Sequence, residues 1–260
     1  AANAETERPT LIIGKCVMGK GARQADNSSY ERNCKTHGAP LGGDAFRNTI
    51  VNLGGDPENP FVIFDQVKEL YAKRAEDLKV IVAGRKAEEA AWAAANPEKA
   101  AAQAEWFSGA APKVDWSKVQ QKAGAPTRNG SAAVLGMLAE NVPNMVVASA
   151  DLSNSDKTDG FLKHTTVITR DNFAGGFFQA GVSELTMACV CIGMTLHGGI
   201  LTAMGTFFVF SDYMKPAIRM AALMELPVKF VWSHDAFRVG EDGPTHEPVE
   251  QEAQIRLMEK

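Results

Sequence analysis

Side chains that could carry acid–base or metal chemistry are densest near the end of the chain. His234, Asp235, Asp242 and His246 lie among glycines, just before a helical pattern. Imidazole and carboxylate groups can bind a divalent metal or act as general acids and bases. The same residues also fit a solvated acidic turn in which Thr245 caps the last helix, and composition alone favours that turn.

A single carboxylate, Glu184, opens an otherwise apolar helical pattern, LTMACVCIGMTLHGG. Burial of an unpaired carboxylate is unfavourable. One interpretation is a helix-start carboxylate that interacts with the helix dipole, which is the commoner case. The other is a buried acid that meets a partner, often a ligand nitrogen.

Aromatic and cationic residues leave similar choices open. Phe207, Phe210 and Tyr213 form either a packed core stripe or a stacking wall for a flat heterocycle. Arg128 is either a surface charge at a helix start or a clamp for an anion. His37 ends a long loop, where a lone histidine is more often a surface residue.

Cys189 and Cys191 lie in one helical pattern, where two residues apart means side chains about 200° apart. They cannot bind one ion together, so we expect core packing. The sequence has no G-x-G-x-x-G or Walker motif.

The elements that position these residues follow from periodicity and turn signals. An apolar run predicts a buried strand over 10–18, and a long irregular loop follows over 19–43. Further strands are expected over 145–150, 165–169 and 228–232. Helices are expected over 44–53, 60–75, 85–104 (interrupted at Asn96–Pro97), 131–141, 179–196, 213–224 and from 248.

Alternation of strands and helices predicts an α/β fold with mostly parallel sheets flanked by helices. Prolines and glycines in residues 108–126 are typical of a linker. We therefore expect two partial domains, over 1–110 and 127–260, joined by residues 111–126. Ligands bind beyond the carboxyl ends of parallel strands, which directs attention to the loops 149–152, 169–172 and 233–235.

Composition limits the function classes. The chain has 260 residues, 45% of them hydrophobic, and a net charge of −4. This composition excludes wholesale disorder and argues against nucleic-acid binding. No apolar stretch reaches the roughly 18 residues of a membrane span. Four scattered cysteines and no signal pattern indicate a cytoplasmic protein. Neither end carries a start or stop signal, so we expect an interior fragment.

Five segments together resemble transketolase, the thiamine-diphosphate enzyme, in order and spacing over nearly the whole chain. They are THGAPLGG (36–43), ASADLSNS (148–155), GVSELTMA (181–188), LHGGILTAMGTFFVFSDYMKPAIRMAALM (196–224) and SHDAFRVGEDGPTHEPVEQ (233–251). The resemblance implies the thiamine-diphosphate-binding fold, with the end of the diphosphate-binding domain followed by the start of the pyrimidine-binding domain. It also implies Mg²⁺ or Ca²⁺ in the parent enzyme, with no metal ligands in this chain.

The resemblance also implies residue roles. Glu184 matches the glutamate that bonds N1′ of the cofactor's aminopyrimidine. The remaining matches fall into four groups: the stacking wall (Phe207, Phe210, Tyr213), positions close to the cofactor (Asp151, His37), groups that bind donor hydroxyls and assist proton transfer (Asp242, His246), and a sugar-phosphate clamp (Arg128, Ser155, His234). His37 and His246 are counted with Glu184 as catalytic.

The implied parent is a cytoplasmic homodimer of the pentose phosphate pathway that transfers a two-carbon ketol unit between sugar phosphates. An isolated fragment is expected to be inactive. Two departures from the family pattern, Arg238 and a long loop over 22–35, affect substrate detail. The alternatives are a non-catalytic assembly module of the same fold and a metal-dependent hydrolase that uses His234, Asp235, Asp242 and His246.

Overall fold

The computed structural model describes residues 2–235 and 242–258. Two compact units divide the chain, Ala1–Glu89 and Ala90–Lys260, and each is described by itself. The division falls within the helix α2 (Asp65–Ala95). In the described part of the chain, no helix is long and apolar enough to cross a membrane.

The first unit contains two 3₁₀ turns, η1 (Ala2–Ala4) and η2 (Cys34–Thr36), the helix α1 (Gly43–Asn52) and most of α2. Helix α1 confirms the prediction over 44–53 to within a residue. The two helices expected over 60–75 and from 85 are one continuous helix that begins at Asp65. Between them Gly84 is the weakest helix former, and glycine lowers helix stability by only about 1 kcal/mol.

The predicted strand over 10–18 is wrong. These residues have no regular structure, and Leu11, Ile12 and Ile13 are each more than three-quarters exposed. A buried strand needs neighbouring strands on both sides. The described residues of the first unit contain no named strand, only the isolated bridge between Arg23 and Ser29.

The loop over 19–43 is irregular, as predicted, and is tied to α1. The amide of Arg23 donates to Thr49 Oγ1 at 2.9 Å, and Asn52 Nδ2 donates to the Gly21 carbonyl at 2.9 Å. Gly21 has a φ of +80°, and a Cβ there would lie 2.5 Å from Leu53 Cδ2. The start of the loop therefore folds against the end of the helix.

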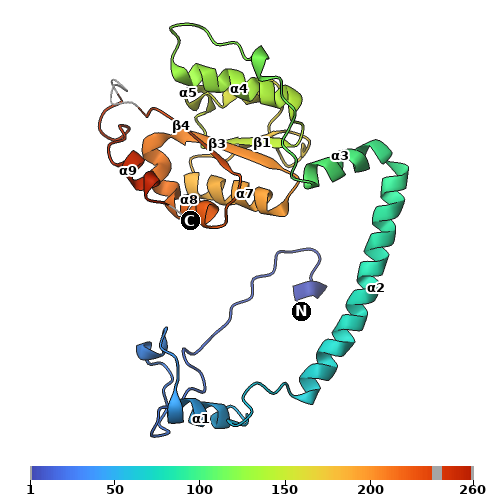
Figure 1. The fold of residues 1–260 in the computed structure, drawn as a ribbon, viewed down its shortest axis with the longest axis vertical. Helices are drawn as coiled ribbons and strands as arrows, with labels where there is room; N and C mark the ends of the chain where they lie inside the picture. The colour runs from blue at the N-terminus through green and yellow to red at the C-terminus, as the bar shows by residue number, and fades with distance from the viewer. Residues whose placement is uncertain (1, 236–241, 259–260) are drawn as a thin grey trace. The chain divides into compact units, whose positions relative to one another are not determined.

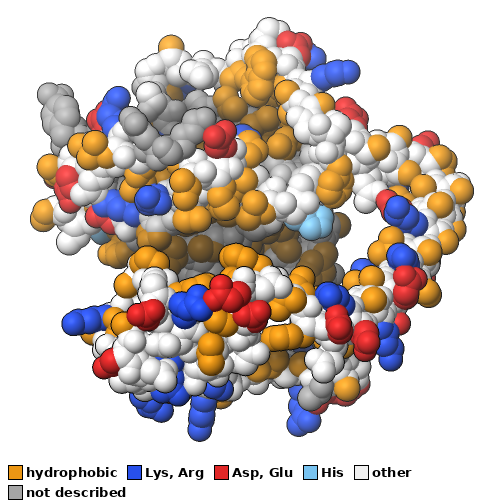
Figure 2. Space-filling model, turned by 60° about the horizontal axis from the view of Figure 1, so that its bottom comes forward, with side chains coloured by type: hydrophobic (Ala, Val, Ile, Leu, Met, Phe, Trp, Pro, Cys, Tyr) orange, Lys and Arg blue, Asp and Glu red, His pale blue; other side chains and the backbone are white. Residues whose placement is uncertain are grey.

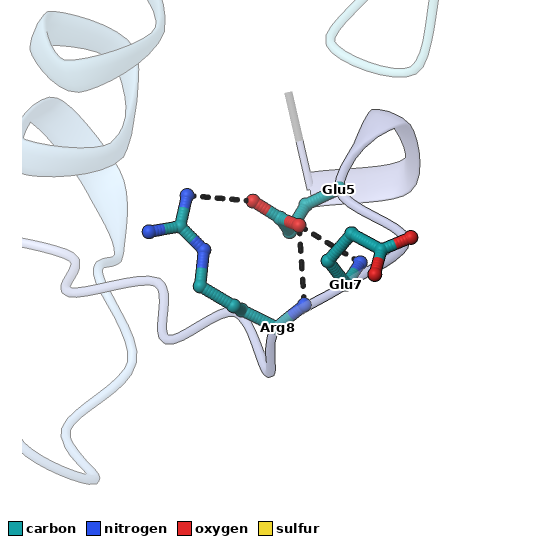
Figure 3. A network of polar contacts seen from close by, with 3 residues as sticks. All are labelled: Glu5, Glu7 and Arg8. Atoms are coloured by element: carbon teal, nitrogen blue, oxygen red, sulfur yellow. Dashed lines mark hydrogen bonds and ion pairs between the residues drawn. The ribbon is translucent and has the colours of Figure 1, made fainter.

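A small polar network orders the N-terminal segment. The Glu5 carboxylate accepts hydrogen bonds from the amides of Glu7 and Arg8 and from the Arg8 guanidinium (Figure 3). These bonds stabilise the charged carboxylate and lower the pKa of Glu5.

Helix α2 exposes apolar side chains along with its charges. None of its residues is buried, and Leu70, Tyr71 and Val80 are each about two-thirds exposed or more. Figure 2 shows hydrophobic side chains, in orange, interspersed with Lys, Arg, Asp and Glu along this helix, at the right of the view. The helix predicted from residue 85 is therefore present, and its residues in α2 are not buried.

The second unit is built on a parallel sheet of order β2-β1-β3-β4, which confirms the predicted α/β class. Its strands are β1 (Met145–Ser149), β2 (Phe177–Gln179), β3 (Leu201–Phe207) and β4 (Lys229–Ser233). Ser149 pairs with Gly205, and Phe207 pairs with Ser233. The carboxyl ends of β1, β3 and β4 therefore share one edge.

Helices cover both faces of this sheet (Figure 1). On one face, α4 (Thr127–Asn141) and α6 (Asp159–Leu162) enclose a core that includes Phe161 and Phe177. On the other, α7 (Glu184–His197) and α8 (Ser211–Leu223) pack around Met187, Met204 and Met214. The remaining elements are α3 (Pro97–Phe107), η3 (Trp116–Lys118), α5 (Ser153–Asp156), η4 (Phe208–Phe210) and α9 (Gln251–Arg256).

One strand prediction is wrong here, and one strand was missed. Residues 165–169 form only isolated bridges, Val167 with Phe177 and Thr169 with Asn172, and β2 takes the place beside β1. Strand β3 was not predicted, because Gly205 interrupts its apolar pattern. That glycine is required by packing, since a Cβ there would lie 2.4 Å from Thr158 Cγ2.

The helix boundaries in the second unit shift modestly. Helix α7 begins at Glu184 rather than at 179, because Phe177–Gln179 belongs to β2. The last helix begins at Gln251, with Glu250 as its N-cap. Thr245 therefore does not cap it, and its hydroxyl instead bonds His246 Nδ1 at 2.8 Å.

Candidate functional site

The predicted functional residues of the second unit gather at the carboxyl ends of β1, β3 and β4. The chain leaves β1 toward β2 through α5 and α6, and leaves β3 in the opposite direction, through α8 to β4. Ligands of open α/β sheets bind where neighbouring connections diverge in this way. The pair β1 and β3 therefore marks the position of a binding site.

Glu184 is buried, with 7% of its surface exposed, at the first position of α7. Thr206 Oγ1, on the neighbouring β3, donates to its Oε1 at 3.5 Å, a long hydrogen bond. In the described part of the chain no other side-chain hydrogen bond reaches this carboxylate. The helix N-terminus favours its negative charge, and its remaining acceptor sites fit a nitrogen-bearing ligand.

An aromatic wall, defined as Phe207, Phe210 and Tyr213, follows directly after Thr206. The Phe207 and Phe210 rings stack with centroids 5.7 Å apart and planes 8° apart. Tyr213 lies 6.0 Å from Phe210 and is 64% exposed. Glu184 thus bonds Thr206 at the end of β3, and the wall begins at the next residue; a carboxylate and aromatic rings are groups suited to a flat heterocycle with a ring nitrogen.

Two histidines from later in the chain lie against this wall. The His234 ring stacks on Phe207 with centroids 3.7 Å apart. His246 approaches Phe210 edge-on at 5.3 Å and Phe207 at 6.1 Å. The cluster that composition alone assigned to an acidic turn therefore contributes its histidines to the site.

Arg128, Ser155 and His234 are brought together as the resemblance implied, although they come from three separate elements. Arg128 Nη1 donates to the Ser155 carbonyl at 3.2 Å and contacts His234 Nε2 at 3.0 Å. A guanidinium only donates, so Nε2 accepts and the His234 proton sits on Nδ1, 2.9 Å from Ser233 Oγ. His234 is therefore neutral in this arrangement.

A hollow of about 360 Å³ opens beside this trio. Its lining includes Arg128, Ser131, Asp156, Ser233 and His234. Burial of His234 lowers its pKa, and the nearby positive charge of Arg128 lowers it further. The guanidinium, hydroxyl and imidazole groups make the hollow suitable for a phosphate group.

Sequence reasoning missed Asp156, which is completely buried at the end of α5. Its carboxylate accepts bonds from Ser149 Oγ at 2.8 Å and from the amide and hydroxyl of Thr158 at 2.8 and 2.7 Å. Burial raises the pKa of Asp156 despite these bonds. A carboxylate in the polar run LSNSDKTD looks like a surface residue until the fold encloses it.

The other predicted residues lie as follows. Asp151 has a φ of +67° directly after β1, and its Oδ1 accepts a bond from Gln179 Nε2 at 2.7 Å. Such left-handed backbone conformations of non-glycine residues cluster at functional sites. Asp242 is exposed. His37 is exposed after η2 in the first unit, and Arg238 lies outside the described residues.

The described residues contain no group of three or more His, Cys, Asp or Glu side chains placed to hold a metal ion. His234 instead contacts a guanidinium, whose charge opposes a cation. The geometry therefore gives no support to a hydrolase centred on His234 and Asp235. Of the two cysteines in α7, Cys191 is fully buried, as predicted, but Cys189 is exposed, so the expectation of core packing is wrong for Cys189. The two side chains lie about 200° apart around the helix, so only one of them faces the core.

Comparison with protein-family models gives two matches that together cover most of the chain. The model described as the thiamine diphosphate binding domain of transketolase matches residues 1–112. The model described as the pyrimidine binding domain of transketolase matches residues 123–260.

Among curated proteins, the transketolase of Halalkalibacterium halodurans is 39% identical over 97% of this chain and 37% of its own length. The probable transketolase of Streptococcus pneumoniae is 40% identical over 96% of this chain and 38% of its own length. The chain thus spans well under half the length of these relatives.

Solved structures of transketolases are also similar to this chain. Transketolase from Leishmania mexicana superposes with a TM-score of 0.85 at 30% identity, over 98% of this chain and 38% of that chain. Transketolase from Pichia stipitis, in complex with sedoheptulose 7-phosphate, gives 0.82 at 29% identity over the same shares.

Proposed function

This chain belongs to the transketolase family, and we propose that it forms part of a subunit that transfers a two-carbon ketol unit from a ketose phosphate to an aldose phosphate. One observation carries the proposal. Thr206 bonds the buried Glu184, and the next residue, Phe207, begins the aromatic wall. The end of β3 therefore carries both the contact to a buried carboxylate and the start of a ring-stacking surface.

The cofactor of this reaction is thiamine diphosphate, which when bound would supply a thiazolium carbon acidic enough to be deprotonated to a nucleophile. Glu184 would share a proton with N1′ of the aminopyrimidine, and the aromatic wall would stack on that ring. The buried, sparsely bonded carboxylate fits this partner. The helix N-terminus would stabilise the negative charge of this carboxylate.

Arg128, Ser155 and His234 would bind the phosphate group of the sugar. The hollow beside them and the hydrogen bonds of Arg128 support this role. Arg128 already lies in place before a ligand arrives, which limits the ordering required on binding. The solved Pichia stipitis complexes with sedoheptulose 7-phosphate and fructose 6-phosphate name ligands of this class.

Asp242 and His246 would bind the donor hydroxyl groups and assist proton transfer. The edge-on contact of His246 with Phe210 supports a position next to the cofactor ring. Asp151 and His37 would lie near the cofactor. General acid–base assistance of this kind contributes roughly 10² to 10⁴ in rate.

The finer features of the parent are part of the same proposal. It is a homodimer of the pentose phosphate pathway that uses Mg²⁺ or Ca²⁺ held by residues outside this chain. All four cysteines are free, which supports a reducing compartment and hence the cytoplasm. The chain by itself would lack activity, because it spans 37–38% of these curated relatives.

A non-catalytic assembly module of the same fold is the alternative. An assembly role would not require a buried carboxylate beside a stacking wall, nor an arginine poised over a hollow. The transketolase relatives also favour the enzyme.

The test is Glu184→Gln in the complete subunit. We expect ketol transfer to fall by about 10² to 10⁴ while the melting temperature stays close to that of the parent. Glu140→Gln is the matched control, because Glu140 is exposed and pairs with His164 at 3.0 Å. Near-normal turnover in Glu184→Gln would end the mechanistic proposal.

A further inference from the structure

Asp156 occupies a junction between three elements of the site. Through Ser149 Oγ it reaches the end of β1, and through Thr158 it fixes the turn into α6. On its third side lies β3, where a Cβ on Gly205 would be only 2.8 Å from Asp156 Oδ2. Glycine at 205 therefore makes room for this carboxylate.

The residue before Asp156 is the one that orients Arg128. The Ser155 carbonyl accepts from Arg128 Nη1 at 3.2 Å, and the same nitrogen contacts His234 Nε2. Ser155 and Asp156 belong to one short turn, α5, which ends at Lys157 with a left-handed φ of +70°. Two backbone bonds to the Leu152 carbonyl close this four-residue turn, and the side-chain bonds of Asp156 are buried bonds that add to them.

We propose that Asp156 is a positioning residue for phosphate recognition: its three hydrogen bonds hold α5 so that the Ser155 carbonyl keeps Arg128 at the hollow. This inference rests on the proposed role of Arg128, Ser155 and His234. Asp156 itself also lines the hollow. A carboxylate there would repel a bound phosphate, so its contribution must come from shape and hydrogen bonding rather than from charge.

The distinction between shape and charge sets the choice of variants. Asparagine at 156 keeps an acceptor oxygen for Thr158, and its amide can donate to Ser149 Oγ. Asp156→Ala removes all three acceptor contacts and leaves buried donors without partners. The Asp156→Asn variant should therefore bind phosphorylated sugars at least as tightly as the unsubstituted subunit does, whereas Asp156→Ala should bind them more weakly.

The experiment measures KM and kcat of the complete subunit with fructose 6-phosphate and with fructose as donors. We expect Asp156→Ala to raise KM for fructose 6-phosphate about tenfold or more. KM for fructose should change much less, and Asp156→Asn should restore phosphate recognition. Thr158→Val removes only one of the three bonds and should give a smaller shift in the same direction, which keeps the test open if Asp156→Ala does not fold.

Thr202→Val is the matched control. Thr202 is also fully buried, and its hydroxyl bonds Thr195 Oγ1 at 2.8 Å, but it lies near the opposite end of β3. Three outcomes would overturn the positioning role. They are an equal rise in KM for both sugars in Asp156→Ala, a similar rise for fructose 6-phosphate alone in Thr202→Val, and a KM in Asp156→Asn that stays as high as in Asp156→Ala. Arg128→Ala tests separately the premise that these residues bind phosphate. If that variant keeps its preference for fructose 6-phosphate over fructose, the proposed phosphate site itself is wrong.

Discussion

The imidazole of His234 lies flat on the ring of Phe207, with centroids 3.7 Å apart and planes inclined by 27°. Because His234 also contacts Arg128, the proposed phosphate clamp and the aromatic wall are joined through one ring pair. His234 has a φ of +54°, a strained conformation for a non-glycine residue. The stacking and the Arg128 contact together stabilise it in that conformation.

Phe207→Leu should weaken both parts of the site. Loss of ring stacking removes about 0.5–1.5 kcal/mol per aromatic pair beyond area burial. We expect a higher thiamine diphosphate concentration for half-maximal activity and a higher KM for phosphorylated donors. Phe208→Leu is the control, because Phe208 stacks on Trp232 at 5.3 Å instead. Equal effects of the two variants would contradict a specific role for Phe207.

Arg128→Ala should weaken phosphorylated donors much more than unphosphorylated ones. A hydrogen bond to a charged group contributes about 1.5–3 kcal/mol, so KM for fructose 6-phosphate should rise at least tenfold. Arg128→Lys should recover only part of the loss, because lysine lacks the planar fork. Arg170→Ala serves as the control for a charge removed from an exposed loop. Proportional losses with both kinds of sugar would rule out the clamp.

Anion binding at His234 should depend on pH. The pKa of His234 lies below its ordinary value of 6.5, through burial and the charge of Arg128, with a smaller lowering from His246 and opposite contributions from Asp242 and Asp235. Acidification therefore protonates a ring that was neutral. The charged ring can no longer accept from Arg128, and both groups then donate to a bound anion.

Sulfate is the suitable probe, because its charge is constant over the range in which the ring titrates. Its affinity should rise as the pH falls from about 8 to 5, and His234→Gln should remove that rise. The same lowered pKa makes the folded state bind fewer protons than the unfolded state. The contribution of His234 to stability is therefore lost as the pH falls below 6.5 through the lowered pKa. An identical pH profile in His234→Gln would contradict the assignment.

Gly205→Ala should destabilise the second unit. The added Cβ would lie 2.4 Å from Thr158 Cγ2 and 2.8 Å from Asp156 Oδ2, and such overpacking typically lowers the free energy of unfolding by about 1–3 kcal/mol. Gly193→Ala is the matched control, because nothing lies within 4 Å of its added Cβ inside α7. That variant should instead gain about 0.4–1 kcal/mol. Urea unfolding of both variants measures the contrast, and a stable Gly205→Ala would contradict the packing.

Local pattern was sufficient for several parts of this protein. The helix that begins at Glu184, the break at Asn96–Pro97 and the strands near 145–149 and 229–233 follow from period, capping and turn chemistry. These features depend on residues that are close in the sequence. Motif likeness added the roles of residues such as Arg128, whose type alone left a surface charge and an anion clamp equally open.

Only the tertiary structure decided which distant residues meet. Arg128 and His234 are 106 positions apart in the sequence, yet Nη1 and Nε2 lie 3.0 Å apart, because the start of α4 and the residue after β4 both border the same hollow. The fold also decided that β2, rather than residues 165–169, pairs with β1. It likewise decided that Asp156 is buried. Strand pairing and burial depend on which surfaces remain for a segment once the rest of the chain has packed, and a short window of sequence does not contain that information.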